Sequence, residues 1–151
     1  MADDRKDIAN AEHRMLVACA DERALRRLIG LARDLDWKAI AAHRGSDALM
    51  LARRIRPTGV VLDLNLEDPS GWSVLDALKR DPTLRHVPVV ALGEGSTTRA
   101  LHLGARQCLG LESSDDALAA ALRDLKEFST KQVKRLLIVE DDARSRQAMS
   151  E

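Results

Sequence analysis

The chain has 151 residues, 45% hydrophobic and 32% charged, which is enough to form a globular core without metal or disulfides. Its 24 basic and 24 acidic residues cancel and its only aromatic residues are Trp37, Trp72 and Phe128, so we expect no DNA or RNA partner. No apolar run approaches the roughly 20 residues of a membrane span, and the polar N-terminus is unlike a signal peptide, so we expect a cytoplasmic protein without membrane contact.

Short apolar runs alternate with amphipathic segments along the chain. The former predict strands and the latter predict helices, because apolar residues recur in them at i, i+3, i+4 and i+7. In chain order the elements are strand Leu16–Ala20, helix Leu25–Leu35, strand Trp37–Ala42, helix Ser46–Ile55, strand Val60–Leu62, helix Gly71–Arg80, strand Val87–Leu92, helix Ser96–Leu103, strand Gln107–Leu109 and a helix that Ser114 caps and that extends to Phe128.

This alternation predicts an α/β fold with a five-stranded parallel sheet and helices on both faces. In such sheets the functional crevice lies at the carboxyl ends of the strands, so the residues that follow each strand are the candidate site. Cys19 and Cys108 would lie three strands apart, about 14 Å, which is too far for a disulfide.

The last residues do not fit this domain. A polar linker precedes a short apolar run, Leu136–Val139, and then the acidic residues Glu140, Asp141 and Asp142. We interpret residues 1–13 as a linker, 14–128 as the domain, 129–134 as a second linker and 135–151 as the truncated start of another domain. We expect the orphan strand to pair with an exposed sheet edge, either in its own molecule or in a second copy, and the latter would give a strand-mediated dimer.

The segment PTGVVLDLNLEDPSGWSVLDALKRDPTLRHVPVVAL, residues 57–92, resembles the receiver domain of bacterial two-component response regulators. There an Asp ends the third strand, and a loop, a Gly and a helix follow. The resemblance covers about residues 15–125 and implies the flavodoxin-like strand order 2-1-3-4-5. The tail RLLIVEDDARSR resembles the start of a second receiver, with Glu140, Asp141 and Asp142 in its acidic cluster, as in a hybrid sensor histidine kinase.

The resemblance also implies a set of phosphotransfer positions, of which this chain keeps one. Asp63 matches the phosphoacceptor, but Cys19 and Ala20 stand in place of the acidic pair that holds Mg²⁺, and Asp21 comes one residue late. Gly93 stands where the family has a hydroxyl-bearing residue, Leu111 where it has a lysine, and Glu112 where it usually has a proline. Cys108 stands where the family commonly has an aromatic residue on the fifth strand. We therefore expect a degenerate pseudo-receiver whose Asp63 is a leftover carboxylate facing solvent.

Three functions follow from the resemblance. The first is a regulatory, non-enzymatic module without a cofactor, which docks on the kinase core or the adjacent receiver of a hybrid histidine kinase. The second is a working receiver, a phosphoprotein that accepts phosphate on Asp63 with Mg²⁺. The third is a ligand- or nucleotide-sensing pseudo-receiver, with Arg99, Arg106 and Arg123 on the face that receivers use for partners.

Other signals are weaker. Cys19 precedes a helix, which can lower a thiol pKa and permit a thiol-dependent enzyme, but Asp21 and Glu22 oppose a thiolate and favour a buried structural cysteine. Gly93–Gly95 suggests a flexible turn rather than a dinucleotide loop. The four histidines show no metal-ligand spacing, so we expect no metal site.

Overall fold

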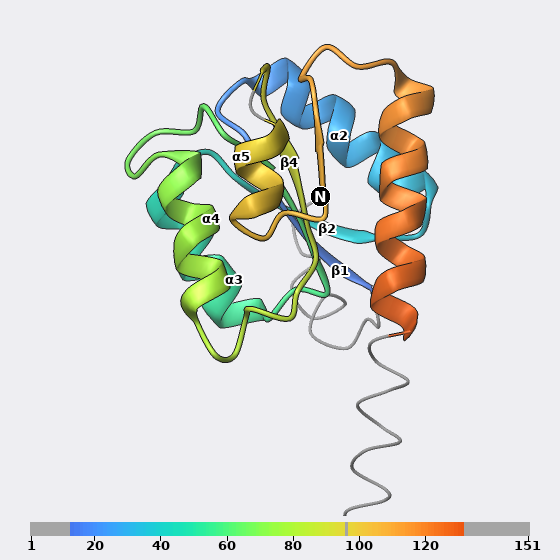
Figure 1. Cartoon of the computed structure of the whole chain (residues 1–151). Coiled ribbons are helices and arrows are strands. Elements are labelled where there is room, and N and C mark those ends of the chain that lie inside the picture. The colour runs from blue at the N-terminus through green and yellow to red at the C-terminus, as the bar shows by residue number, and fades with distance from the viewer. Residues whose placement is uncertain (1–12, 96, 132–151) are drawn as a thin grey trace, which may run out of the picture.

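Parallel strands and helices alternate through the part of the chain that the computed structural model describes, residues 13–95 and 97–131 (Figure 1). The elements are β1 (Arg14–Ala18), α2 (Glu22–Asp34), β2 (Lys38–Ala42), α3 (Gly45–Ile55), β3 (Gly59–Asp63), α4 (Gly71–Arg80), β4 (Val89–Leu92), α5 (Thr97–His102) and β5 (Gln107–Leu109). A further helix, which we call helix 115–131, follows β5. The sheet order is β2-β1-β3-β4-β5, which confirms the predicted fold.

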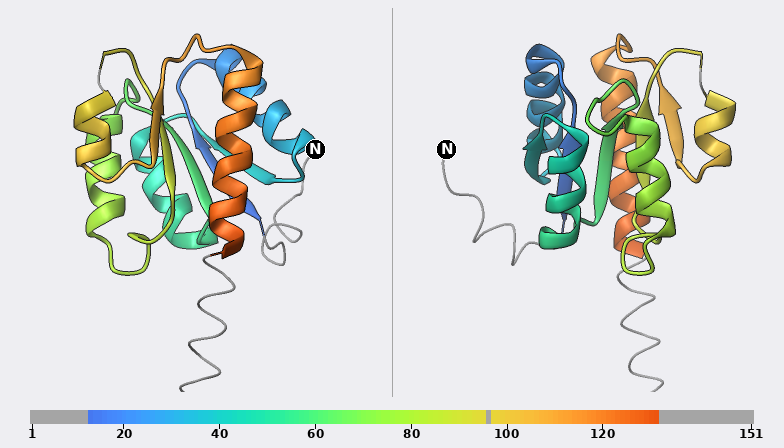
Figure 2. Two further views of the ribbon diagram at one scale, coloured as in Figure 1. Left: turned by 45° about the vertical axis from the view of Figure 1, so that its right-hand side comes forward. Right: turned by 90° about the vertical axis from the view of Figure 1, so that its left-hand side faces the viewer.

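Helices cover both faces of the sheet, as two views of the ribbon show (Figure 2). Alternate side chains of each strand point to opposite faces, so β1 sends Leu16 and Ala18 toward one face and Met15 and Val17 toward the other. The first set packs with α3, α4 and α5, and the second packs with α2 and helix 115–131. The central strand β3 is buried over its whole length, which fixes the position of the residue that ends it.

β1 differs from its predicted bounds by two residues at both ends and β4 by two residues at its start, whereas β2 and β3 differ by one residue. β1 is Arg14–Ala18 rather than Leu16–Ala20, because Arg14 bonds through its backbone N–H and carbonyl to the Thr58 hydroxyl, which extends the strand at its start. Cys19 and Ala20 therefore follow the strand instead of ending it. β4 begins at Val89 rather than Val87, since Pro88 has no N–H for the ladder, although its carbonyl still accepts from Val60.

The helix boundaries hold within a few residues. Ser114 caps helix 115–131 as predicted, with its hydroxyl accepting from the Ala117 N–H at 3.2 Å. Helix 115–131 includes residues 129–131, where the sequence analysis begins a linker. The expected second receiver at 135–151, with Glu140, Asp141 and Asp142, lies outside the described residues. Within those residues, no helix combines the length and the apolar character needed to cross a membrane.

Candidate functional site

Asp63 ends β3 at the carboxyl edge of the sheet, and the following residues are packed tightly against it. The backbone N–H of Leu64 donates to the carbonyl of Leu92 on β4 at 2.9 Å, which holds the start of the loop on the sheet. The loop returns to the strand at Gly71, where a Cβ atom would lie 2.2 Å from the Asp63 carbonyl oxygen. Gly71 is therefore required for this close approach of two backbone segments.

The Asp63 side chain is buried, with 4% of its surface exposed. One carboxylate oxygen, Oδ1, accepts the backbone N–H of Asn65 at 2.9 Å, and Oδ2 lies 3.6 Å from Cys19 Sγ, whose S–H donates to it. The prediction that this carboxylate faces solvent is wrong. The loop folds back over it and the thiol covers its second oxygen, whereas the sequence analysis considered only the strand end.

Cys19 is buried directly beside Asp63. Burial raises the pKa of its thiol to about 12, and the negative charge of Asp63 acts in the same direction. The thiol is therefore neutral at physiological pH and serves as a hydrogen-bond donor. This state argues against the alternative of a thiol-dependent enzyme, which needs a thiolate. Neither cysteine forms a disulfide.

Ala20 and Asp21 complete the loop after β1, and neither supplies a ligand beside Asp63. Asp21 is the N-cap of α2: its carboxylate accepts the backbone N–H of Arg23 at 3.0 Å. In the described ranges, no three His, Cys, Asp or Glu side chains converge closely enough to hold a metal ion. Mg²⁺ prefers oxygen ligands, so a neutral thiol and an alanine do not fit it.

Gly93 and Leu111, which the resemblance matches to the hydroxyl and lysine positions, follow β4 and β5. A Cβ atom at Gly93 would meet Leu64 Cδ1 at 3.1 Å, so the Leu64 side chain takes up part of the space that a hydroxyl-bearing residue would use. Leu111 packs against the apolar layer beneath α2 and helix 115–131. The Glu94 carboxylate lies over Gly110, where a Cβ atom would come within 2.4 Å of Oε1. Next to Gly93 and Gly110, this edge therefore presents the Leu64 side chain and the Glu94 carboxylate.

The three candidate arginines have different neighbours. Arg99 on α5 stacks over the Trp72 ring with 4.2 Å from guanidinium carbon to ring centroid. Arg106 forms a two-pronged ion pair with Asp124, at 2.8 and 3.2 Å, and stacks over Phe128.

That ion pair raises the pKa of Arg106 and lowers the pKa of Asp124. Arg123 is exposed on helix 115–131, beside a groove that Asp34 and Asp36 also line. Arg99 and Arg106 are thus each engaged with neighbours of their own, and a partner role for this face stays a proposal.

The sequence analysis missed two participants at the carboxyl edge. Asn65 contributes its backbone N–H to Asp63, and the signal was its position two residues after an Asp, the spacing of an Asx turn. Leu64 fills the space next to Gly93, and no local pattern indicates this because the two residues belong to different strands.

Comparison with known proteins decides the family. No family model matches the sequence. The chain is 33% identical over 116 residues to the response regulator PleD of Caulobacter vibrioides, a match that covers 74% of this chain and 24% of PleD. It is 41% identical over 56 residues to the polar-differentiation response regulator DivK of Brucella anthropi, covering 37% of this chain and 46% of DivK. The chain contains a response-regulator receiver domain. It spans about a quarter of PleD and under half of DivK.

Solved structures agree with this receiver domain in fold. A signal receiver domain of a LuxO repressor protein from Vibrio parahaemolyticus has a TM-score of 0.72 at 21% identity, covering 80% of this chain and 95% of that one. The bacteriophytochrome response regulator RtBRR has a TM-score of 0.66 at 27% identity, covering 75% and 77%. A receiver domain of a signal transduction histidine kinase from Syntrophus aciditrophicus has a TM-score of 0.68 at 21% identity, covering 75% and 89%.

Proposed function

We propose that this receiver domain regulates a larger two-component signalling protein without accepting a phosphoryl group. The observation that carries the proposal is the contact between Cys19 and Asp63, 3.6 Å from sulfur to carboxylate oxygen. A receiver that is phosphorylated uses Mg²⁺ to offset the negative charge at its acceptor aspartate. In this chain the protonated Cys19 thiol lies at that place instead. In this interpretation Asp63 joins the ends of β1 and β3 as a structural residue.

The chemistry of phosphoryl transfer supports the same conclusion. Transfer depends on cations that neutralise charge on the phosphoryl group, and an aspartyl phosphate adds nearly two negative charges. Leu111 provides no cation at the lysine position, and Glu94 adds a carboxylate at the same edge of the sheet. An oxyanion at Asp63 would therefore gain little stabilisation from these neighbours.

We infer further that the domain acts by docking in a hybrid histidine kinase in the bacterial cytoplasm, on the kinase core or on the adjacent receiver. The tail supports this inference, since Glu140, Asp141 and Asp142 follow an apolar run as in the first strand of another receiver. The proposed docking surface is the face of α5, β5 and helix 115–131. Regulation then depends on a partner that binds two arrangements of the domains with different affinity.

Reaction with a small phosphodonor tests the proposal. We expect no phosphoryl adduct by intact-mass measurement when the 151-residue chain is incubated with acetyl phosphate and Mg²⁺. The matched control is the Cys19→Asp, Ala20→Asp double variant, which restores the acidic pair and should gain reactivity toward the same donor. An adduct on the unmodified chain that Asp63→Asn abolishes would instead establish the working receiver, the second function considered above.

Docking is tested separately from phosphotransfer. Binding of the chain to the parent protein's kinase core can be measured by calorimetry. Asp63→Asn should leave the affinity unchanged, and Arg99→Glu on α5 should weaken it because it reverses a charge on the proposed docking surface. If Arg99→Glu binds the kinase core as tightly as Asp63→Asn does, the docking contact lies outside this surface.

A further inference from the structure

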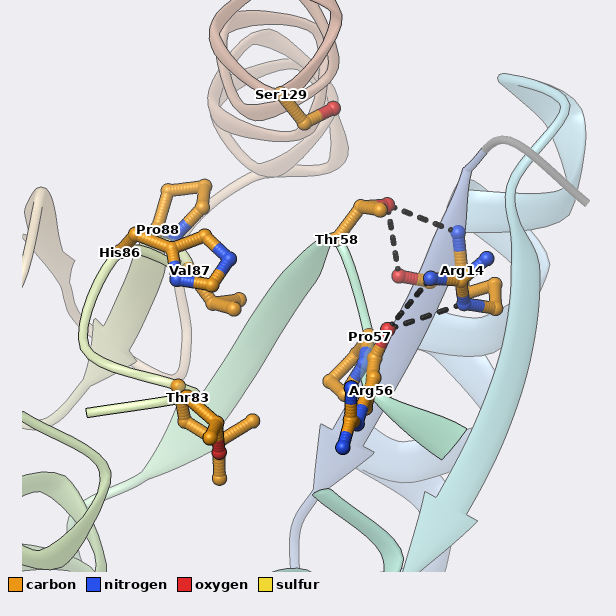
Figure 3. Close-up of a pocket in the computed structure, with 10 residues that line it drawn as sticks. Arg14, Arg56, Pro57, Thr58, Thr83, His86, Val87, Pro88 and Ser129 are labelled. Carbon is orange, nitrogen blue, oxygen red and sulfur yellow. Dashed lines mark hydrogen bonds between the residues drawn. The ribbon is translucent and has the colours of Figure 1, made fainter. Parts of the chain in front are cut away.

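A cavity of about 250 Å³ opens at the amino-terminal edge of the sheet, the edge opposite Asp63. Two loops form facing walls, with Arg56, Pro57 and Thr58 on one side and Thr83, His86, Val87 and Pro88 on the other (Figure 3). Arg14 at the start of β1 and Ser129 of helix 115–131 also line it. The cavity thus lies where the first strand begins and the last described helix approaches its end.

The ionisable side chains that line this cavity are all basic. Its lining side chains include Arg14, Arg56 and His86 and no carboxylate. Arg14 is held in place, because its Nε and Nη2 both donate to the Arg56 carbonyl, at 3.1 and 2.7 Å. Asp81 comes two residues before Thr83 in the chain but does not line the cavity. Its carboxylate accepts from both the N–H and the hydroxyl of Thr83 and pairs with Arg53 at 3.7 Å.

The rest of the lining is apolar. Leu84 and Val87 form buried apolar surface, and Pro57 and Pro88 flank it. An apolar cavity of roughly 150 Å³ holds a benzene molecule. The cavity found here, about 250 Å³, therefore accommodates one ring or a short alkyl chain together with a charged head group.

We propose that this cavity binds a small anion with an apolar body, a carboxylate or a phosphate ester, whose head group accepts hydrogen bonds from the Arg56 guanidinium and the His86 imidazole. The site is separate from Asp63, so the proposal holds or fails independently of phosphotransfer. Because its walls include the start of β1 and helix 115–131, a bound anion would join the two ends of the domain. Ligand binding would then affect how neighbouring domains connect to it.

A titration of the 151-residue chain followed by amide NMR tests the proposal. The probes are phenyl phosphate and benzoate, which distinguish a phosphate site from a carboxylate site, with benzyl alcohol as the neutral analogue. We expect saturable shifts at Thr58, Thr83 and Val87 with at least one anion and none with the alcohol. Inorganic phosphate alone should bind more weakly than phenyl phosphate, since it lacks the apolar body.

Two variants with matched controls localise the binding. Arg56→Asn removes the charge and suits the left-handed backbone at that position, where φ is 48°. It should weaken anion binding about tenfold, the loss expected for one charge-assisted hydrogen bond, whereas Arg54→Asn on the outer side of α3 should not. His86→Gln should weaken binding and Arg85→Gln should not. Absence of saturable shifts, or equal losses from both members of a pair, would overturn the proposal.

Discussion

Restoring the acidic pair should destabilise the domain and make its stability depend on Mg²⁺. In the Cys19→Asp, Ala20→Asp double variant, a carboxylate replaces a thiol whose sulfur lies 3.6 Å from Asp63 Oδ2. Two unit charges at that separation repel by about 4–5 kcal/mol at an effective dielectric constant near 20. Domains of this size are stable by only about 5–15 kcal/mol, so this repulsion is a large fraction of the total.

Magnesium should offset part of this loss. A cation that binds the folded state only adds about 2.7 kcal/mol when its concentration is 100 times its dissociation constant. Urea unfolding with EDTA and with Mg²⁺ measures the difference directly. We expect the double variant to gain stability with Mg²⁺ and the unmodified chain not to change.

Two controls make this prediction specific. Cys19→Ser preserves a neutral donor and should show neither the loss nor the metal response. Asp63→Asn in the double-variant background should remove most of the response, because it removes one of the carboxylates that would hold the metal. A double variant that is as stable as the parent chain in EDTA and unaffected by Mg²⁺ would refute the assignment of residues 19 and 20 to the acidic-pair positions.

Three further predictions follow from the structure. In a background without the other cysteine, Cys19 should resist iodoacetamide at pH 7–9 in the folded chain and react on unfolding, because burial raises the pKa of its thiol to about 12. The Cys19 thiol should stabilise the fold fully below its unfolded pKa near 9.0, and this stabilisation is lost as pH rises toward 12. The free energy of unfolding should therefore decline more steeply at alkaline pH than it does in Cys19→Ala. Arg106→Met should destabilise the domain by about 1 kcal/mol in urea at pH 7. Because the ion pair lowers the pKa of Asp124, this stability difference between Arg106→Met and the parent chain is present above pH 3.8 and is lost as pH falls through the pKa of folded Asp124. A stability difference that does not change with pH would contradict the ion pair as its cause. Gly71→Ala should destabilise by about 3 kcal/mol or more, since its Cβ would overlap the backbone of β3, and a thermal melt unchanged from the parent would exclude that contact.

The fold was predictable because it depends on local patterns that repeat along the chain. Uninterrupted apolar runs mark strands buried on both faces, and the i, i+3, i+4 spacing marks the helices between them. The predicted boundaries are wrong where a tertiary contact decides them. Arg14, for example, belongs to β1 because its backbone bonds to the hydroxyl of Thr58, 44 residues away.

The candidate site was predictable only as a set of positions. The resemblance placed Cys19 and Asp63 at neighbouring strand ends, and the structure brings them within hydrogen-bonding distance. It did not indicate that Asp63 is buried, because that depends on how the loop after β3 folds back at Gly71. Similarly, the pairing of Arg106 with Asp124 spans 18 residues and two elements, and no local spacing predicts it.

The central claim is that Asp63 is a structural residue rather than a phosphoacceptor, and an amide NMR spectrum with Mg²⁺, before and after addition of beryllofluoride, tests it most directly. Beryllofluoride mimics a phosphoryl group on a receptive aspartate. We predict an unchanged spectrum, because the Cys19 thiol covers the second oxygen of the carboxylate and the positions beside it provide no matched metal ligand. Shifts centred on Asp63 and spreading through residues 93–111 would contradict the account and establish a competent receiver.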